Sequence, residues 1–336
     1  MYNILFKSKF NPFFKFSILL ILAITTNFFT SCKNSIFDTD GNDGELNYHL
    51  QFGSSIQVIN GNILISGLKA KNREISSKFW VNGKSTEKSA FMNQIKNQSG
   101  FREAINNQSR IVYNYKDNQG NIQEFQFFQS AFREKELMPY FLNGKEIKLS
   151  SDSTGTISAV SFYHNKPIFA GTYGKFVGTE MGSAFAPKSA FFWEENTGFT
   201  ELIIPKESQV FNGITSIYRH SPEETYVAGL CGIPMYWKNT EAIVLNKNLH
   251  GEVHQIIKNG NDLYAVGLIN KRNSNSTGHT ACYWKNGEIH ELEDNAQAYG
   301  IFVDGTDVYI TGATGVVPTA YKPCYWKNGK RIDLEM

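Results

Sequence analysis

The sequence predicts an all-β protein, a β-propeller with six blades of four antiparallel strands each. From Leu46 onward, short runs of alternating apolar and polar residues are separated by Gly, Asn and Asp, which is the pattern of strands joined by tight turns. A pair of aromatic residues recurs six times in this part of the chain and includes all five tryptophans. The pairs are Phe79-Trp80, Tyr140-Phe141, Phe192-Trp193, Tyr236-Trp237, Tyr283-Trp284 and Tyr325-Trp326. Repeats of this kind are typical of a propeller, in which a large ring at a constant position fills the space between neighbouring blades.

A tight hairpin follows the aromatic pair in most units. In four of them an Asn-Gly begins two residues after the second aromatic residue, at Asn82, Asn143, Asn286 and Asn328. Asn and Gly tolerate the positive φ angles of a type I′ turn. We therefore expect each Asn-Gly to join the third and fourth strands of its unit.

The first two strands of each unit carry a second repeated landmark. The short first strands of the six units are centred on Ile56, Ile105, Val160, Ile217, Ile256 and Ile301. In four units a glycine follows the centre by eleven residues, at Gly67, Gly171, Gly267 and Gly312, whereas Gly229 follows by twelve and Lys116 takes this position in unit two. The spacing predicts a hairpin between the first and second strands. No convincing helix is expected, although Lys88 to Gln98 could form a short one.

The segment from Ala281 to Gly287 contains the repeat in full, as Ala-Cys-Tyr-Trp-Lys-Asn-Gly. This pattern resembles the tryptophan- and glycine-containing repeats of HAF-type extracellular proteins, which are found in bacterial lipoproteins. The resemblance covers nearly all of the chain after the N-terminal segment. It implies a propeller fold and a location outside the cytoplasm, and it implies no particular reaction.

Residues 1–32 predict a secretory signal peptide. Three lysines precede an apolar run from Phe16 to Phe29, which is shorter than the about 20 apolar residues that a membrane-spanning helix needs. The small residues that lead into Cys32 resemble the lipobox of bacterial lipoproteins, with Phe29 in place of the usual leucine. The resemblance implies that Cys32 becomes the lipidated first residue of the mature chain. A plain secreted protein is the alternative.

The rest of the chain divides into a tether and one domain. Residues 33–45 are polar and mostly acidic and predict a flexible tether, which leaves 46–336 as a single propeller domain. Without the three lysines of the signal peptide, 30 basic residues face 31 acidic ones. A near-neutral protein lacks the basic stripe that nucleic-acid binding requires, so no nucleic-acid partner is expected. Contact with a membrane is expected through the lipid anchor only, and the sequence does not define an oligomeric state.

Three cysteines remain in the predicted domain. Cys282 and Cys324 occupy the same position in successive repeats, and Cys231 leaves an odd number that cannot pair completely within one chain. Equivalent positions in neighbouring repeats are expected to lie farther apart than the ~7 Å that a disulfide tolerates. The sequence therefore predicts buried free thiols that act as small core residues.

A first candidate site lies at the start of the innermost strands. The residues one and two positions before each central Ile or Val are expected to approach the central channel, and most of them are small. The exceptions are Glu103, His254, Gln255 and Tyr299. We expect these four at the mouth of the channel as a hypothetical ligand site, with His254 as a base or metal ligand and Glu103 as its carboxylate partner. A water-filled polar lining is the alternative.

A second candidate site lies on the loops between the second and third strands. Measured from the glycine position to the second aromatic position, the six units span 13, 25, 22, 8, 17 and 14 residues. Variable loops on a fixed scaffold often carry recognition. Two insertions place Phe127, Phe128, Tyr173 and Phe176 on this rim, where they could stack on a sugar, receive a partner protein or fold over the sheets.

The expected function is that of an outer-membrane or surface lipoprotein, facing the periplasm or the outside, whose propeller binds or scaffolds a protein or glycan partner on the variable-loop face. The alternative is a carbohydrate-active hydrolase or lyase at the mouth of the channel. Such an enzyme needs two carboxylates about 5 to 10 Å apart, and Glu103 is the one carboxylate among the predicted channel residues. The sequence contains no nucleophile elbow and no phosphate-binding loop. No cofactor, no metal site and no catalytic residue is predicted, and the single carboxylate among the channel residues favours a non-enzymatic role.

Overall fold

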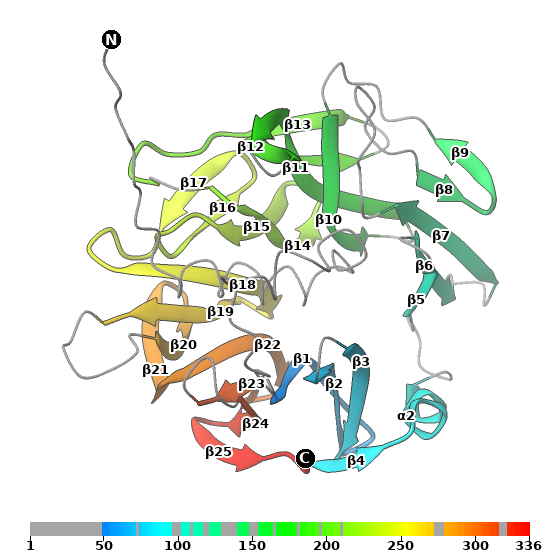
Figure 1. Ribbon diagram of the computed structural model, residues 1–336, viewed down its shortest axis with the longest axis vertical. Helices are drawn as coiled ribbons and strands as arrows, with labels where there is room; N and C mark the ends of the chain where they lie inside the picture. Colours follow the sequence, from blue (N-terminus) through cyan, green and yellow to red (C-terminus); the bar gives the residue numbers. More distant parts are fainter. Residues whose placement is uncertain are drawn as a thin grey trace.

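The computed structural model describes residues 49–71, 74–95, 102–107, 110–116, 121–128, 140–147, 154–163, 166–179, 182–194, 197–208, 211–271, 279–315 and 321–336. Within these residues the chain forms six antiparallel sheets, one after another along the sequence and arranged around a common centre (Figure 1). Five of the sheets have four strands, and the second sheet has five. The predicted all-β propeller is confirmed, whereas the expectation of four strands in every unit is wrong for unit two.

The strands follow the chain order within every sheet. Sheet one contains β1 (His49–Ile59), β2 (Asn62–Lys71), β3 (Glu74–Val81) and β4 (Lys84–Thr86), and helix α2 (Lys88–Ile95) follows it. Sheet two contains β5 (Arg102–Asn107), β6 (Arg110–Lys116), β7 (Ile122–Phe128), β8 (Tyr140–Leu142) and β9 (Lys145–Ile147). Sheet three contains β10 (Thr154–Tyr163), β11 (Lys166–Thr179), β12 (Gly182–Glu194) and β13 (Gly198–Leu202). Sheet four contains β14 (Gly213–Ser221), β15 (Glu224–Leu230), β16 (Met235–Lys238) and β17 (Glu241–Val244). Sheet five contains β18 (His250–Asn259), β19 (Asp262–Asn270), β20 (His279–Lys285) and β21 (Glu288–Asp294), and sheet six contains β22 (Ala296–Asp304), β23 (Asp307–Thr314), β24 (Lys322–Lys327) and β25 (Lys330–Asp333).

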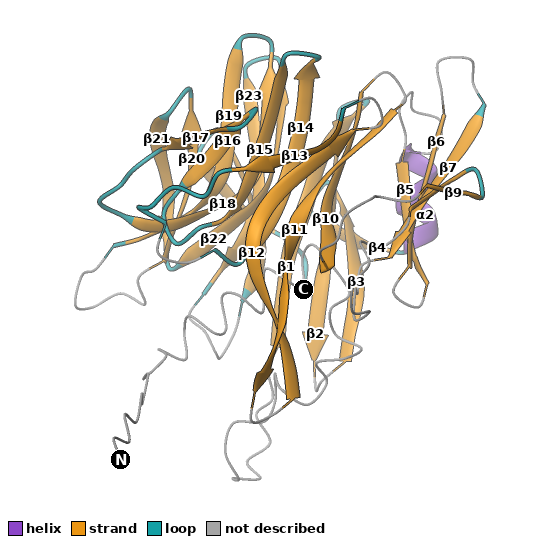
Figure 2. Ribbon diagram, turned by 90° about the horizontal axis from the view of Figure 1, so that it is seen from above, coloured by secondary structure: helices purple, strands orange, loops and turns teal. Residues whose placement is uncertain are grey.

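The connections of the four-stranded sheets lie on two opposite faces. Hairpins between the first and second strands, and between the third and fourth, share one face, which we call the hairpin face. The first strands begin on the other face, where the second strands also end, and we call it the loop face. The long strands β11 and β12 extend beyond the other strands on the loop face (Figure 2). The insertion that contains Tyr173 and Phe176 is therefore a projecting β-hairpin.

A β-bulge recurs at the same position in the first strand of all five four-stranded sheets. The unpaired bulge residues are Ser54, Ser158, Thr215, His254 and Tyr299. In each sheet the residue before the bulge pairs with the repeated glycine of the second strand, as Val253 pairs with Gly267. A Cβ atom on Gly267 would lie 1.9 Å from the carbonyl oxygen of Glu252, so only glycine is accommodated there. The repeated glycine therefore marks the bulge.

The Lys-Asn-Gly part of the repeat fastens the outer hairpin to the second strand. In sheet five the Oδ1 of Asn286 accepts a hydrogen bond of 2.8 Å from the amide of Leu263, and its Nδ2 donates one of 2.8 Å to Asp262. Lys285 forms an ion pair of 2.8 Å with the same aspartate. Asn286 and Gly287 have φ angles of 54° and 88°, which the tight turn requires. Sheet six repeats these contacts with Asp307, Val308, Lys327 and Asn328.

The repeated tryptophan packs against the preceding sheet. Trp326 of sheet six is 1% exposed and clusters with Tyr264 and Val266 of sheet five. Its Nε1 donates a hydrogen bond of 3.3 Å to Glu293 in β21 of sheet five. The tryptophans are therefore part of the core between sheets, as predicted.

The C-terminal residues join the last sheet to the first. Leu334, directly after β25, packs in one cluster with Trp80 of sheet one. The Nε1 of Trp80 donates a hydrogen bond of 2.7 Å to the carbonyl oxygen of Glu335, and the amide of Glu335 donates one of 3.0 Å to Gly83. The innermost strands β10, β14, β18, β22 and β1 also contact one another in this order. The described sheets three to six and sheet one thus form one continuous packed arc.

Sheet two departs from the repeat by one additional strand. The Oδ1 of Asn143 accepts a hydrogen bond of 2.9 Å from the amide of Glu124 in β7, a contact that the hairpin asparagines of the other sheets make with a second strand. Counted inward from the outermost strand β9, β7 corresponds to the second strand of the other sheets and β6 to their first strand. Strand β5 is therefore an extra inner strand. The alignment of Ile105 in β5 with Ile56 is therefore wrong by one strand. The pairing of β5 with β6 also lacks the bulge.

Helix α2 covers sheet one where a tryptophan covers the other sheets. Phe91 and Met92 of the helix pack on Leu64 of β2. The residues that correspond to Leu64 in the other four-stranded sheets are Ile168, Tyr226, Tyr264 and Tyr309, and each clusters with the tryptophan of the next sheet. The helix thus supplies apolar contacts at the position of sheet one that corresponds to the tryptophan contacts of the other sheets. The short helix considered for Lys88 to Gln98 is present over Lys88–Ile95.

The cysteines of the domain and the lengths of its helices complete the description of the fold. Cys231, Cys282 and Cys324 are free and buried, as predicted. In the part of the chain that the structure describes, no helix has the length and apolar character needed to cross a membrane.

Candidate functional site

The bulge residues of sheets four and five bond to the next sheet. The hydroxyl of Thr215 donates a hydrogen bond of 2.8 Å to the carbonyl oxygen of Val253 in sheet five. The Nδ1 of His254 lies 2.6 Å from the carbonyl oxygen of Ala298 in sheet six. A carbonyl oxygen can only accept, so Nδ1 of His254 carries a hydrogen and donates it. The bulge therefore directs a donor across the boundary between two sheets.

The residue after the bulge bonds to the same neighbour. The hydroxyl oxygen of Ser216 accepts a hydrogen bond of 3.3 Å from the amide of Ile256 in sheet five. The Oε1 of Gln255 accepts one of 2.7 Å from the amide of Ile301 in sheet six. At the next boundary Gly300 lies so close to sheet one that a Cβ atom would be 2.7 Å from the carbonyl oxygen of Ser54. In sheets four and five, two successive residues of the inner strand thus bond to the inner strand of the next sheet.

His254 also contacts a buried carboxylate. Its Nε2 lies 3.4 Å from Oε2 of Glu252, and the two side chains are 4% and 8% exposed. With Nδ1 donating to Ala298, a favourable contact with Glu252 requires a proton between Nε2 and Oε2. Both ring nitrogens are therefore engaged within the protein. This arrangement leaves no nitrogen of His254 for a substrate or a metal ion.

A second group of buried polar side chains adjoins His254. The ring of Tyr299 stacks on the imidazole with centroids 5.2 Å apart, and its hydroxyl donates a hydrogen bond of 2.5 Å to Oε1 of Gln297. Nε2 of Gln297 donates one of 2.8 Å to the hydroxyl of Tyr321 and lies 3.4 Å from Nδ1 of His279. Burial raises the pKa of Tyr299 well above its usual value, so this residue remains a neutral donor. Burial lowers the pKa of His279, which favours the neutral ring that can accept from Gln297.

The predicted channel residues thus divide into two groups. His254, Gln255 and Tyr299 lie together between sheets five and six, and His254 and Tyr299 are 7% and 2% exposed. Glu103 lies on the extra strand β5, opposite Asn114 of β6. The structure brings Glu252 to His254, and the side chain of Glu103 lies outside the described residues.

Four members of the network, Glu252, His279, Gln297 and Tyr321, were missed by sequence reasoning. Glu252 and Gln297 each lie two residues before a bulge residue, and period-two alternation along the strand could have suggested them. Tyr321 comes from the start of the third strand in sheet six. No local pattern in the sequence connects Tyr321 with β22.

The predicted rim residues lie on two hairpins. Tyr173 in β11 is half-buried, and its ring centroid is 6.2 Å from that of Phe191, so it packs on its own sheet. Phe176 pairs directly with Phe185 in the projecting β11–β12 hairpin. Phe127 and Phe128 end strand β7 and pair with Tyr140 and Arg110. The side chains of Phe127, Phe128 and Phe176 lie outside the described residues, as does Cys32.

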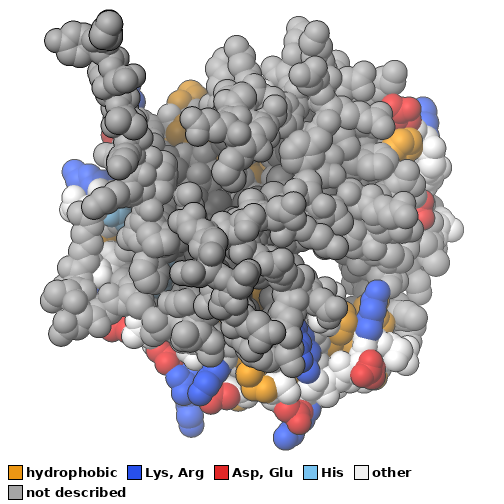
Figure 3. Space-filling view, in the orientation of Figure 1, with side chains coloured by type: hydrophobic (Ala, Val, Ile, Leu, Met, Phe, Trp, Pro, Cys, Tyr) orange, Lys and Arg blue, Asp and Glu red, His pale blue; other side chains and the backbone are white. Residues whose placement is uncertain are grey.

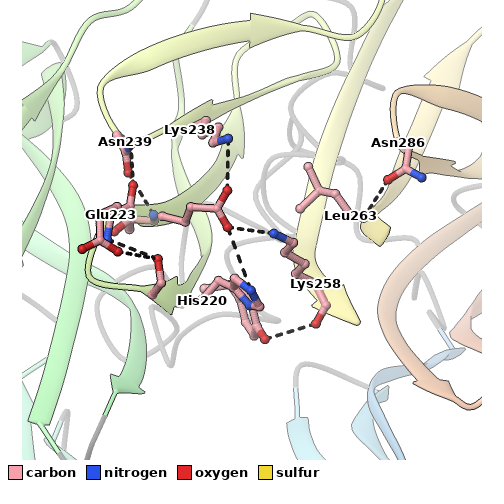
Figure 4. Close-up of polar contacts among 11 residues, drawn as sticks. His220, Glu223, Lys238, Asn239, Lys258, Leu263 and Asn286 are labelled. Carbon is pink, nitrogen blue, oxygen red and sulfur yellow. Dashed lines mark hydrogen bonds and ion pairs between the residues drawn. The ribbon is translucent and has the colours of Figure 1, made fainter. Parts of the chain in front are cut away.

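The hairpin face carries paired charges. Glu224 of sheet four accepts contacts from Lys238 at 3.1 Å and from Lys258 of sheet five at 2.7 Å, and His220 lies 4.0 Å away (Figure 4). Hydrogen bonds from Lys258 and Lys238 lower the pKa of Glu224 to about 2. Along the outer edge of sheets six and one, described acidic and basic side chains alternate (Figure 3). Among these charges, the pair of Glu224 and Lys258 connects sheets four and five.

Metal binding finds no support in the described residues, since no group of three His, Cys, Asp or Glu side chains among them could hold a metal ion. The predicted histidine ligand, His254, uses both nitrogens for other contacts. The network can therefore hold two sheets in a fixed geometry, and His254 has no ring nitrogen left for a substrate.

The sheet order, the repeated bulge and the repeated tryptophan contacts define the chain as a β-propeller. No protein-family model matches the sequence, and no curated protein matches it. The β-propeller domain of the Trilobed protease from Pyrococcus furiosus, described as having an open velcro topology, is 10% identical with a TM-score of 0.40, over 85% of this chain and 96% of that one. Trypanosoma rangeli sialidase is 6% identical with a TM-score of 0.41 over 83% of this chain and 55% of that one, and Pyrococcus horikoshii acylaminoacyl peptidase is 10% identical with a TM-score of 0.43 over 85% and 52%. The chain spans about half the length of these two proteins. Likenesses this weak transfer no activity.

Proposed function

We propose that the chain is a lipoprotein of the bacterial cell envelope, anchored in the outer membrane through Cys32, whose propeller binds or scaffolds a protein or glycan on its loop face. The observation that carries this proposal is that polar residues of the inner strands form hydrogen bonds within the protein. Thr215, Ser216, His254 and Gln255 bond to the neighbouring sheet. Because these side chains already bond within the protein, they favour a rigid scaffold whose binding site lies elsewhere.

The loop face is the favoured site of recognition. Its connections differ in length between units, and the β11–β12 hairpin projects from it (Figure 2). The turns of the hairpin face, in contrast, are short and bonded to their own sheets, as at Asn286 and Asn328. Variation on one face and uniformity on the other support a binding role for the variable face.

The enzymatic alternative is a carbohydrate-active hydrolase or lyase at the mouth of the channel. Such an enzyme would use a pair of carboxylates with room for a substrate between them. The carboxylate that the structure places in the described inner-strand network, Glu252, is buried against His254. This contact favours the binding role over the enzymatic one.

Thermal unfolding of the mature chain tests the proposal. A panel of glycans, peptidoglycan fragments, divalent ions and a chelator is added, and a ligand at about 100 times its dissociation constant stabilises the fold by ~2.7 kcal/mol. We expect a sugar or peptide class to raise the unfolding temperature. The matched variant replaces residues 176–185 by an Asn-Gly turn between Lys175 and Ala186, which face each other in the hairpin. Loss of the shift in this variant supports the loop face, and turnover of a glycan by the unaltered protein would overturn the non-enzymatic proposal.

A further inference from the structure

The path of the chain determines which face of the propeller is nearest to the N-terminal anchor. The described part of the domain begins at His49, the first residue of the innermost strand β1. His49 pairs with Lys71, where β2 ends on the loop face. The segment that leads from Cys32 therefore enters the propeller on the loop face.

Reaching the opposite face from this entry point requires a long path. Strand β18 has ten residues, from His250 to Asn259, so the two faces are ~33 Å apart at 3.3 Å per residue. Three spacings between the four strands of a sheet add ~15 Å from the innermost to the outermost strand. A chain that starts at His49 must cover ~48 Å to pass over the edge of a sheet and reach the level of the hairpin face.

The segment between the anchor and the domain is short compared with this path. Sixteen residues, 33–48, separate Cys32 from His49. Fully extended they span at most ~58 Å, whereas a flexible chain of that length has a root-mean-square span of only ~24 Å. Turning the hairpin face to the membrane would hold the segment near its full extension, at a large cost in conformational entropy. The short span is sufficient when the loop face is turned to the membrane.

We infer that the anchored propeller turns its loop face toward the membrane and its hairpin face away from it. The inference rests on the proposed lipidation of Cys32. The β11–β12 hairpin then projects into the gap between the propeller and the bilayer. The partner of this face is a protein that resides in or on the same membrane, because a partner in the bulk compartment meets the hairpin face first.

Some described charges on the loop face lie beside charges of opposite sign, which favours a protein over the lipid surface itself. Lys206 is followed by Glu207, and Lys271 lies 3.8 Å from Asp294 and also pairs with Glu291. Anionic headgroups attract clusters of cations that are free to face them. Mixed and paired charges of this kind suit a polar protein surface better.

Energy transfer from single labels to the bilayer tests the orientation. The full chain is produced in lipidated form with either His250→Cys or Asn261→Cys, two exposed positions at opposite ends of β18. The three cysteines of the domain are each 0% exposed, so the introduced thiol is the one that a folded-state label reaches. Vesicles of phosphatidylethanolamine and phosphatidylglycerol carry an acceptor on the headgroup. We expect the label at position 250 to lie ~30 Å closer to the acceptor layer than the label at position 261.

Each outcome has one meaning for the proposals. Equal transfer from both positions, or stronger transfer from position 261, in a protein that floats with the vesicles would overturn the orientation and leave the anchor intact. A chain that does not become lipidated, and floats no better than Cys32→Ser, would overturn the proposed anchor itself. Flotation of the Cys32→Ser protein with the vesicles would show that the propeller binds the bilayer directly, which would contradict a protein partner. A 20-residue Gly-Ser insertion after Ser35 should reduce the difference between the two labels.

Discussion

The imidazole Nδ1 of His254 lies 2.6 Å from the carbonyl oxygen of Ala298, and this contact joins two successive sheets of the propeller. Thr215 makes the equivalent contact one sheet earlier, with Val253. The same bulge positions therefore hold residues that differ in size and chemistry and perform one structural task. Polar side chains near a propeller axis can thus hold neighbouring sheets together rather than bind a ligand.

The asparagine of the outer hairpin is expected to stabilise the fold in two separable ways. Asn286→Ala removes the acceptor for Leu263 and the donor to Asp262, and it also places an alanine at a φ of 54°. We expect a loss of about 2 kcal/mol in the free energy of unfolding. Asn286→Gly loses the same hydrogen bonds without the backbone strain and should cost about 1 kcal/mol. Urea unfolding of both variants checks this order, and an alanine variant as stable as the glycine variant would contradict it.

Removal of the C-terminal residues is expected to weaken the junction between sheets six and one. Deleting residues 334–336 removes Leu334, which is 4% exposed, and the carbonyl oxygen of Glu335 that accepts from Trp80. Loss of a buried leucine and of hydrogen bonds should lower the free energy of unfolding by about 3 to 5 kcal/mol. Deletion of Met336 alone, which is 58% exposed, is the control and should change it by less than about 0.5 kcal/mol. Equal stabilities of the two truncated chains would disprove the junction.

The ion cluster around Glu224 gives the fold a defined pH dependence. Because Lys258 and Lys238 lower its pKa to about 2, the folded state binds a proton at Glu224 less readily than the unfolded state does. The stabilisation is therefore present above the ordinary glutamate pKa of about 4.3 and is lost as the pH falls toward 2. We expect Glu224→Gln to reduce stability by less than about 1 kcal/mol at pH 7, since the pair is partly exposed, and to have little effect once the pH is below 2. Thermal melts across this pH range, with Glu223→Gln as the control, should show the difference disappearing only for Glu224.

Several elements of the fold could be predicted from the sequence because each has a local cause. The Asn-Gly turns, the tryptophan position and the repeated glycine depend on backbone angles, ring size or close approach at a single residue. Repetition then defined the sheets, since the same local causes recur at similar intervals.

Sheet two and the polar network could not be predicted because their causes are not local. Unit two has an additional strand. Ile105 was aligned from the spacing between the repeated landmarks, and this spacing does not reveal the additional strand. The approach of Glu252, Gln297 and Tyr321 to His254 and Tyr299 depends on how sheets five and six pack. A polar residue near the axis was therefore expected to face the channel, although the bulge turns it to the next sheet.

The most direct test of the account is the free energy of unfolding of His254→Phe, measured with urea and compared with that of His250→Phe at the exposed end of the same strand. The phenylalanine fills a similar volume but loses the bond to Ala298 and leaves Glu252 buried without its partner. A connecting role predicts a loss of about 3 to 5 kcal/mol for His254→Phe and a loss below about 1.5 kcal/mol, the net contribution of a single exposed contact, for His250→Phe. Equal stabilities of the two variants would show that His254 does not join the sheets. The polar residues of the inner strands would then again be candidates for a ligand site.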